Sequence, residues 1–554
     1  MERARRWTAW LPALAVAPFL FLFLFTTLQR IGVPYELEWN EGQSAEQALR
    51  FVQGLPLYPA PESGWVPYMY APGYHIVFGT LFRVTGSRHL FWGRLISLMS
   101  TLAAALAIVL VVNDRTRHLP AAAMAGLLWF AWFRPSGFWF DIARNDALAF
   151  ALAAWGCLFT LRLRPGRGEI AAGLLLLTLG TFTKQTVGPL AAFCALRLLV
   201  REGRRVPRRI LVRVCLVGAA LLSVSTVLLF ERTGSTHLMH YVVHNAVHHP
   251  SDASVWMPGE VAPHVFALNT AGRSALGKAI EWTARSFADP PKVWTQAGRH
   301  VWLLVLAIPL LVLAGRRRFR GVAYLVPALL LGWGGLAGFA KYGGYRNNFL
   351  PLFLGVTILF GIGAGHALRK RTGLAGIVLP AALAVLLLVQ TIQPWSLGKF
   401  DGGGLYYRPS AQLPAAGTDE AFADVMEWLD EKRRAGETVW VPHHQWYGYL
   451  AGHPIGMNPD MVRCAVWAGD PEPGELAGAL KNGEYDWVLL DHEELADEWL
   501  SDPVRAALRE YYEPLPQPIG RVPGAPDALL PATGAGMRPR WPWKKVDPVT
   551  VRAE

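Results

Sequence analysis

The chain has 554 residues, of which 52% are hydrophobic and only 17% are charged. This apolar balance excludes an ordinary soluble enzyme and indicates a membrane protein. The formal net charge of +12 would suit nucleic-acid binding, but the basic residues lie mostly in short clusters between hydrophobic segments, which membrane topology explains better. The cysteines show no spacing typical of a metal site.

The first hydrophobic segment, Trp7–Leu28, is long enough to cross a hydrocarbon core of roughly 30 Å. The basic sequence MERARR precedes it, so the positive-inside bias predicts a cytoplasmic N-terminus and an outer position for the first loop, residues 31–90. Within this loop, apolar residues at helical spacing predict an amphipathic helix suited to the membrane interface. Residues 71–84 are predicted to form a juxtamembrane or partly inserted helix.

The remaining hydrophobic segments predict a polytopic α-helical membrane protein with about 11 spans. The apolar block 170–200 is interpreted as a hairpin that turns at the sequence TKQT, because a single helix would put the basic sequence REGRRVPRR outside. A turn at membrane depth is tolerated where protein or a water-filled cavity surrounds it. The other predicted spans are residues 91–112, 119–133, 147–161, 210–230, 301–314, 322–340, 349–368 and 373–392.

The predicted membrane core covers residues 1–393 and includes a long outer loop, residues 231–299. Residues 394–554 are predicted to form a small outer, soluble α/β C-terminal domain. It contains helix-like stretches at 419–434 and 475–481, a short strand at 438–442 and an apolar run at 486–491. The Pro content from about residue 514 onward predicts an irregular end.

Three carboxylates, Glu36, Glu38 and Glu41, follow the first span within a few residues. The spacing of Glu38 and Glu41 allows both to share one helix face. One of them could act as a general base towards an acceptor hydroxyl, while the other binds or orients it. The alternative interpretation is an ordinary, solvated acidic loop.

The next predicted outer loop places Asp141, Arg144 and Asp146 against the start of a span. Charges at that depth are usually paired or functional, so either substrate binding or a structural pair within the loop would explain them. Lys184, at the predicted hairpin turn, suits a phosphate, although lysines also snorkel without a function.

In the sequence KYGGYRNN, Tyr345 and Arg346 are further candidates for substrate binding. Its two glycines permit close backbone approach, and the Arg346 guanidinium can grip a phosphate. The alternative for Arg346 is an arginine at a helix end, lying at the membrane interface.

Histidines crowd into residues 237–249, and His237, His240, His244 and His248 fall on one helical face. Such a face could hold a metal, bind a phosphate or line a polar groove. No helical carboxylate stands beside it, so no metal is expected, and His244 and His248 are kept as substrate-binding candidates. The chain has no Asp-x-Asp pair and no phosphate loop, which favours a lipid-linked over a nucleotide-linked sugar donor.

The motifs EWNEGQ, GLPLY, YAPGYH, FDIARNDALAFAL, LGTFTKQT and GGYRNN follow one another along residues 1–393. This order resembles the C-type (GT-C) membrane glycosyltransferase superfamily, and more narrowly its bacterial members related to protein mannosyltransferases and to lipid A aminoarabinose transferase. The resemblance implies a helical membrane core and often an outer C-terminal domain. It also implies Glu41 at the family's acidic position with Glu38 as a rival, since this chain has Asn40-Glu41 where many relatives have an Asp-Glu pair.

The resulting expectation is an inverting glycosyltransferase that moves a sugar from a polyprenyl-phosphate donor to a lipid-linked glycan, polysaccharide or protein acceptor. It would work on the outer face of a bacterial cytoplasmic membrane, among membrane lipids, with no required cofactor and no nucleic acid. Arg144, Lys184 and Arg346 would neutralise the leaving phosphate. The alternatives are an O-antigen ligase or polymerase that uses the histidine loop, and a lipid or glycan transporter without covalent chemistry. Charges at span ends and the lack of a repeat disfavour the transporter.

Overall fold

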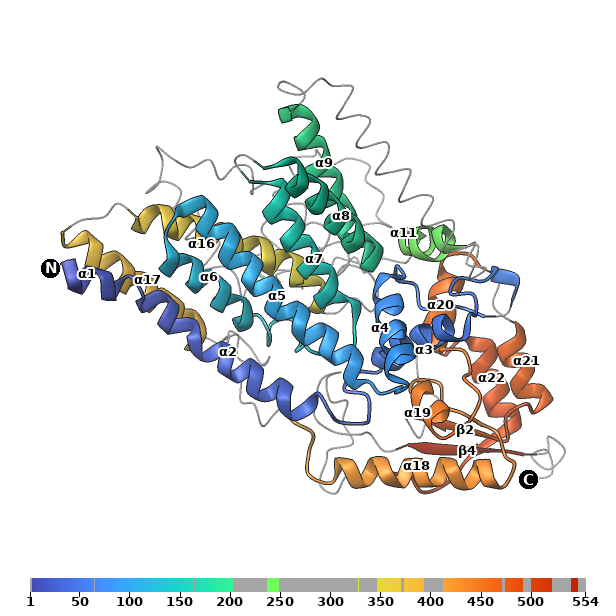
Figure 1. Ribbon diagram of the computed structural model, residues 1–554. Helices are drawn as coiled ribbons and strands as arrows, with labels where there is room; N and C mark the ends of the chain where they lie inside the picture. The colour runs from blue at the N-terminus through green and yellow to red at the C-terminus, as the bar shows by residue number, and fades with distance from the viewer. Residues whose placement is uncertain are drawn as a thin grey trace, which may run out of the picture.

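The computed structural model describes residues 2–63, 65–162, 165–202, 237–248, 327, 346–369, 373–392, 412–470, 474–491, 500–520 and 540–546. The predicted spans 210–230 and 301–314, nearly all of 322–340, most of the long loop and Tyr345 lie outside these residues. Figure 1 shows long helices running side by side from the N-terminal end, and a mixed α/β part gathered at the opposite end. The helices α3 and α4 lie between the two parts.

Within the described residues, three helical stretches are long and apolar enough to cross a membrane: Glu2–Arg30, Phe91–Thr116 and Arg346–Leu368. Shorter apolar helices accompany them, and together they fit a polytopic helical membrane protein. The helices of this part are α1 (Glu2–Thr8), α2 (Leu11–Arg30), α5 (Phe91–Thr116), α6 (Leu119–Ala131), α7 (Asn145–Thr160), α16 (Leu350–Leu368) and α17 (Ala375–Ile392).

Small residues let these apolar helices approach one another closely. A Cβ atom added to Gly361 of α16 would lie 2.6 Å from Cβ of Ala125 on α6. One added to Gly365, a turn further along, would lie 2.6 Å from Cβ of Thr116 at the end of α5. Because lipid chains are as apolar as these side chains, such close packing is what holds helices together in a membrane.

The predicted hairpin is confirmed by a break between two helices. The helix α8 (Arg167–Thr183) ends at Lys184, which has an extended backbone (φ −150°, ψ 121°). A short 3-10 turn, η2 (Gln185–Val187), leads into α9 (Gly188–Glu202), and α9 packs back on α8. Lys184 is buried at this turn.

The first predicted outer loop contains α3 (Asn40–Gln53), the 3-10 turn η1 (Pro61–Ser63) and α4 (Gly73–Thr85). The apolar face of α3 packs on aromatic side chains of α4 through Ala45, Ala48 and Leu49. The opposite, polar face is buried as well, since Gln47 donates to the Leu57 carbonyl and α19 of the C-terminal part packs on α3. The first part of α3, residues 41–49, is therefore enclosed by protein on both faces, whereas Gln53 at its end is exposed.

The residues described between 412 and 546 form a sheet of four strands in the order β1-β2-β4-β3, with helices packed around it. The strand β1 pairs parallel with β2, and the other pairs are antiparallel. The elements are α18 (Thr418–Arg434), β1 (Val439–Trp440), α19 (Gln445–Leu450), α20 (Pro459–Trp467), α21 (Gly474–Asn482), β2 (Trp487–Leu490), α22 (Asp502–Tyr511), β3 (Tyr512–Pro514) and β4 (Trp541–Lys545).

The prediction of an irregular end from about residue 514 is wrong for β4. This strand lies between β2 and β3 and pairs with both. Proline lacks a backbone donor and is uncommon inside sheets, so Pro542 concealed the strand in the sequence. In the structure the Pro542 carbonyl still accepts a hydrogen bond from the Leu515 amide at 2.8 Å.

Candidate functional site

Glu41 is fully buried in the first turn of α3, and both of its carboxylate oxygens are engaged. Oε1 accepts from Arg94 Nε at 2.9 Å and from the Ala143 amide at 2.6 Å. Oε2 accepts from Arg94 Nη2 at 2.8 Å and from the Leu37 amide at 2.6 Å. Burial disfavours the carboxylate, but the charge and hydrogen bonds of Arg94 and the two amides outweigh it and lower the pKa of Glu41.

Arg94, which was not predicted from the sequence, binds the backbone before α3 as well as the Glu41 carboxylate. Its guanidinium also donates to the carbonyls of Val33 at 2.7 Å and Tyr35 at 2.6 Å. The residue is completely buried near the start of α5. A lone arginine within an apolar segment is the signal that would have found it, because such a charge needs a partner.

Glu38 is buried but less firmly held than Glu41. Its Oε1 accepts from Asn40 Nδ2 at 2.9 Å, and its Oε2 accepts from the Asn40 amide and from Arg144 Nη1, each at 3.2 Å. Burial raises the pKa of Glu38 to about 7, with the Arg144 charge acting in the opposite direction. Glu38 is therefore suited to gain or lose a proton near neutral pH.

Arg144 lies between Glu38 and a group of aromatic rings. Its guanidinium carbon is 4.4 Å from the Trp139 ring centroid, 5.4 Å from that of Tyr68 and 5.7 Å from that of Tyr70. Its Nε is buried and has no hydrogen-bond partner among the described residues. A guanidinium with one carboxylate partner and an unused donor can still bind an anion.

Lys184 meets residues from three other motifs next to Arg144. Its Nζ donates to Asp146 Oδ1 at 2.6 Å, and Asn347 Nδ2 donates to the same oxygen at 3.3 Å. The Tyr70 ring, which faces Arg144, also lies 5.4 Å from Lys184 Nζ. Four separate motifs, those that carry Lys184, Asp146, Asn347 and Tyr70, are thus brought together beside the buried Arg144.

Arg346 is connected to this cluster through the chain. It is the first residue of the 3-10 turn η6 (Arg346–Phe349), which also carries Asn347. Its side chain is half-buried. Tyr345, the other candidate of this motif, lies outside the described residues.

The charged residues of the FDIARND sequence form ion pairs with residues outside it. They do not pair with one another, as the alternative of a structural pair within the loop would require. Asp141 is held by Arg30 at the end of α2, with Arg30 Nε donating to its Oδ2 at 2.8 Å. Arg144 pairs with Glu38, and Asp146 pairs with Lys184. Each pair joins elements far apart in the chain, which spacing alone does not reveal.

Of the four histidines predicted to share one helical face, His240 and His244 lie on η3 (His240–His244) and His248 on α11 (Asn245–His248), which packs against α20. His237 lies just before η3, and its carbonyl accepts a hydrogen bond from the Tyr241 amide. His240 Nε2 is 2.8 Å from Asp470 Oδ1 of the C-terminal part. The His244 ring stacks on that of His240, and His248 lies against His244 and is exposed. In the part of the chain that the structure describes, no group of three or more His, Cys, Asp or Glu side chains is arranged to hold a metal ion.

Two uncharged residues of the first loop belong to this site although the sequence drew no attention to them. His75 of α4 is completely buried, and its ring centroid is 5.8 Å from that of Tyr68. Burial lowers the pKa of His75 to about 4, so it is neutral at physiological pH. The Tyr68 hydroxyl is buried without a hydrogen-bond partner among the described residues. Buried polar atoms of this kind are expected to bind water or a ligand.

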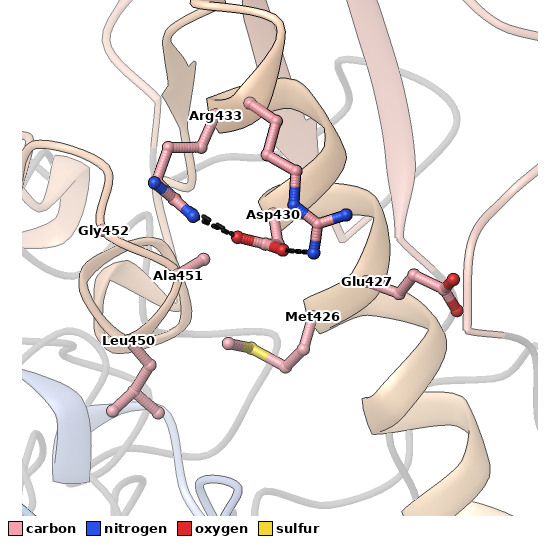
Figure 2. Close-up of a pocket in the computed structure, with 8 residues that line it drawn as sticks. Met426, Glu427, Asp430, Arg433, Leu450, Ala451 and Gly452 are labelled. Carbon is pink, nitrogen blue, oxygen red and sulfur yellow. Dashed lines mark hydrogen bonds and ion pairs between the residues drawn. The ribbon is translucent and has the colours of Figure 1, made fainter.

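An open pocket on the far side of the C-terminal part is separate from these residues. Figure 2 shows it between α18 and the end of α19, lined by Met426, Glu427, Leu450 and their neighbours. Its central carboxylate, Asp430, is already bound by Arg433 and Arg434. None of the charged residues around Arg144 lines this pocket.

Buried charges lie at the ends of the apolar helices, and the described fold fits a polytopic helical membrane protein. No protein-family model and no curated protein sequence matches the chain. Among solved structures it is similar to ArnT from Cupriavidus metallidurans bound to undecaprenyl phosphate, with 14% identity, coverage of 96% of this chain and 97% of ArnT, and a TM-score of 0.50.

The chain is also similar to the archaeal oligosaccharyltransferase AglB from Archaeoglobus fulgidus, in complex with an inhibitory peptide and a dolichol-phosphate. That likeness has 10% identity, covers 89% of this chain and 73% of AglB, and has a TM-score of 0.45. ArnT, a lipid A aminoarabinose transferase, and AglB are both GT-C proteins. The likeness to ArnT agrees with the resemblance expected from the motifs, at the level of the fold alone.

Proposed function

We propose that the chain is an inverting glycosyltransferase that takes a sugar from a polyprenyl phosphate and transfers it to a hydroxyl-bearing acceptor of the cell envelope. The observation that supports this most strongly is the buried cluster in which Glu38, with a pKa of about 7, contacts Arg144 beside Lys184. A base next to two cations suits a reaction in which a proton is removed and a phosphate leaves. The fold shared with ArnT, whose structure contains undecaprenyl phosphate, agrees with a lipid-phosphate donor.

In this proposal the two cations bind the phosphate of the donor. The aromatic rings around Arg144 exclude water and strengthen its attraction for an anion. As the bond between the anomeric carbon and the phosphate oxygen breaks, the electron pair stays on the polyprenyl phosphate. Arg144 and Lys184 would stabilise the charge that develops there, which is commonly a large part of catalysis.

Glu38 is the general base of the proposed reaction. The acceptor hydroxyl gives its proton to the Glu38 carboxylate while its oxygen bonds to the anomeric carbon on the face opposite the phosphate. One displacement of this kind inverts the anomeric configuration. Glu41, whose oxygens are all engaged by Arg94 and two amides, would hold the loop in place rather than accept the proton.

The reaction is proposed to take place on the outer face of the bacterial cytoplasmic membrane, with residues 394–554 on that side. The experiment that tests the function is mass spectrometry of lipid-linked glycans and envelope polymers from a deletion strain. We expect a sugar-loaded polyprenyl phosphate to accumulate and one sugar to disappear from an envelope component. Unchanged lipid-linked glycans and envelope polymers in the deletion strain would contradict the proposed activity.

Topology provides an independent prediction, since every predicted inner loop carries a basic cluster. A reporter fused after Arg317 is expected to show a cytoplasmic position, and one fused after Asp419 an external position. Paired phosphatase and fluorescent-protein fusions at both sites measure this. A cytoplasmic signal after Asp419 would contradict both the topology and an outer site.

Arg346 is expected to contribute to donor binding, because η6 also carries Asn347, which shares Asp146 with Lys184. Arg346→Lys keeps the charge but loses the planar fork that binds a phosphate through two donors, so its Kd for undecaprenyl phosphate should rise. Arg346→Ala should weaken binding further. Titration of the purified variants with undecaprenyl phosphate measures both effects, and wild-type affinity in Arg346→Ala would exclude this residue from the site.

A further inference from the structure

We propose that His444 of the C-terminal part is a positioning residue that fixes the loop carrying Glu38. It does so by bridging two carboxylates, Glu36 of that loop and Asp491 at the end of β2. This inference rests on the proposed function for its catalytic meaning, and it assigns the C-terminal part a role in the site.

The bridge is a continuous, largely buried chain of ionisable groups. His444 Nδ1 contacts Oε2 of Glu36, and His444 Nε2 lies 3.3 Å from Asp491 Oδ2. The other Asp491 oxygen accepts from Arg540, which is buried at the start of β4. Although burial opposes it, the Arg540 guanidinium, aided by His444, holds the pKa of Asp491 well below its usual range. Asp491 is therefore a fixed anion against which His444 is oriented.

Aromatic packing holds the imidazole in one orientation. The Tyr447 ring stacks on the His444 ring, with centroids 5.0 Å apart and planes 15° from parallel. The Tyr447 hydroxyl oxygen accepts a hydrogen bond from the Glu36 amide at 3.2 Å. The C-terminal part thus holds both the backbone and the side chain of Glu36.

The Glu36 side chain packs tightly against the backbone of Gly42. A Cβ atom added to Gly42 in the first turn of α3 would lie 2.0 Å from Glu36 Oε1 and 3.1 Å from Cβ of Trp446 on α19. Glu36 is therefore enclosed between α3 and the C-terminal part. A larger residue at Gly42 would displace the carboxylate from His444.

Glu38 lies between two anchors in the chain. Two residues before it, Glu36 is bound by His444, and three residues after it, Glu41 is bound by Arg94 of α5. Loss of one anchor would let the intervening backbone rotate and move the Glu38 carboxylate relative to Arg144. A misplacement of about 1 Å in a catalytic group can cost about 10²-fold in rate.

The test compares His444→Ala, Glu36→Ala and the double variant in nanodiscs, with sugar-loaded polyprenyl phosphate extracted from a deletion strain as the donor. We expect kcat to fall about 10-fold to 10²-fold in each, with the donor KM nearly unchanged, because the phosphate-facing cations are untouched. The double variant should be no slower than either single one, since both remove the same bridge. His444→Gln keeps one hydrogen bond and should recover part of the rate.

Asp430→Ala is the matched control, because Asp430 belongs to the same part but is bound only by neighbouring arginines of α18 among the described contacts (Figure 2). It should leave kcat unchanged. Hydrogen exchange of residues 36–41, measured without donor, supplies a readout independent of turnover. It should rise in His444→Ala and His444→Gln but not in Asp430→Ala.

The outcomes separate the two proposals. If the wild type transfers no sugar, the proposed function fails, and the exchange of residues 36–41 alone decides the role of His444. Unchanged exchange in both His444 variants would overturn the positioning role. It would also be overturned if His444→Ala kept wild-type kcat, or if the losses in the double variant were additive.

Discussion

Glu38→Gln is expected to lower the rate of sugar transfer by about 10² to 10⁴-fold, the usual effect of removing a general base. The amide keeps the shape of the side chain and can still pack against Asn40 and Arg144, but it cannot accept the proton of the acceptor hydroxyl. Binding of undecaprenyl phosphate should be retained, because Arg144 and Lys184 remain. The measurement is single-turnover transfer and lipid binding by the purified variant in nanodiscs.

The pH dependence of the wild type supplies the control for this prediction. A base works only when ionised, so kcat/KM should fall as the pH decreases through about 7, the pKa of Glu38. In Glu38→Gln the residual rate should lose this dependence. His248→Ala, which changes an exposed histidine, should keep both the rate and the pH profile of the wild type. Full activity in Glu38→Gln would exclude Glu38 as the base.

Glu41→Gln is expected to destabilise the protein rather than remove only the chemical step. The substitution leaves the Arg94 guanidinium buried without a counter-charge, and it turns an amide donor towards the N–H group of either Leu37 or Ala143. Breaking a buried ion pair by removing one partner typically costs about 3–5 kcal/mol. Thermal unfolding in detergent should therefore occur at a clearly lower temperature, with turnover and donor binding lost together.

The comparison with Glu38→Gln distinguishes the two carboxylates. Glu38→Gln should unfold close to the wild-type temperature, because it removes one long hydrogen bond to Arg144 and relieves a carboxylate that burial disfavours. Replacing Glu41 and Arg94 together should recover part of the stability lost in Glu41→Gln, since no buried charge is then left alone. A Glu41→Gln protein that is as stable as the wild type but inactive would reverse the proposed roles.

The sequence predicted the parts of the fold that depend on local periodicity and charge. The hairpin at Lys184 was predicted because a single helix would have placed a basic cluster on the wrong side, and the described helices α8 and α9 confirm it. The helix-like stretch 419–434 and the short strand 438–442 were likewise expected from the sequence, and α18 and β1 lie there. Local patterns of this kind do not depend on distant residues.

The pairing of the charges was not predictable, because each pair joins distant segments. Arg30 with Asp141 and Arg94 with Glu41 are the examples, and in both cases the arginine lies within or at the end of an apolar helix that was interpreted only as a span. The aromatic rings of Tyr68 and Tyr70 were missed for a different reason. They carry no charge, and their importance comes from lying beside Arg144 and Lys184 in space.

The link between the acidic loop and the C-terminal part also depends on the fold. His444 lies in the sequence PHHQWYGY, which has no spacing that points to a site. Its proposed role depends on the fold, because β2 places Asp491 at one ring nitrogen of His444 while Glu36 contacts the other. Arg540, which donates to Asp491, directly precedes the strand β4. The proline within β4 concealed this strand in the sequence.

The most direct test of the account is the release of sugar-free polyprenyl phosphate by the purified protein. Sugar-loaded lipid extracted from a deletion strain is incubated with the protein and an envelope extract, and both lipids are measured by mass spectrometry. The account predicts that the wild type converts the donor to polyprenyl phosphate only when the acceptor extract is present, and that Glu38→Gln binds the donor without converting it. Conversion at the wild-type rate by Glu38→Gln, or no conversion by the wild type, would contradict it.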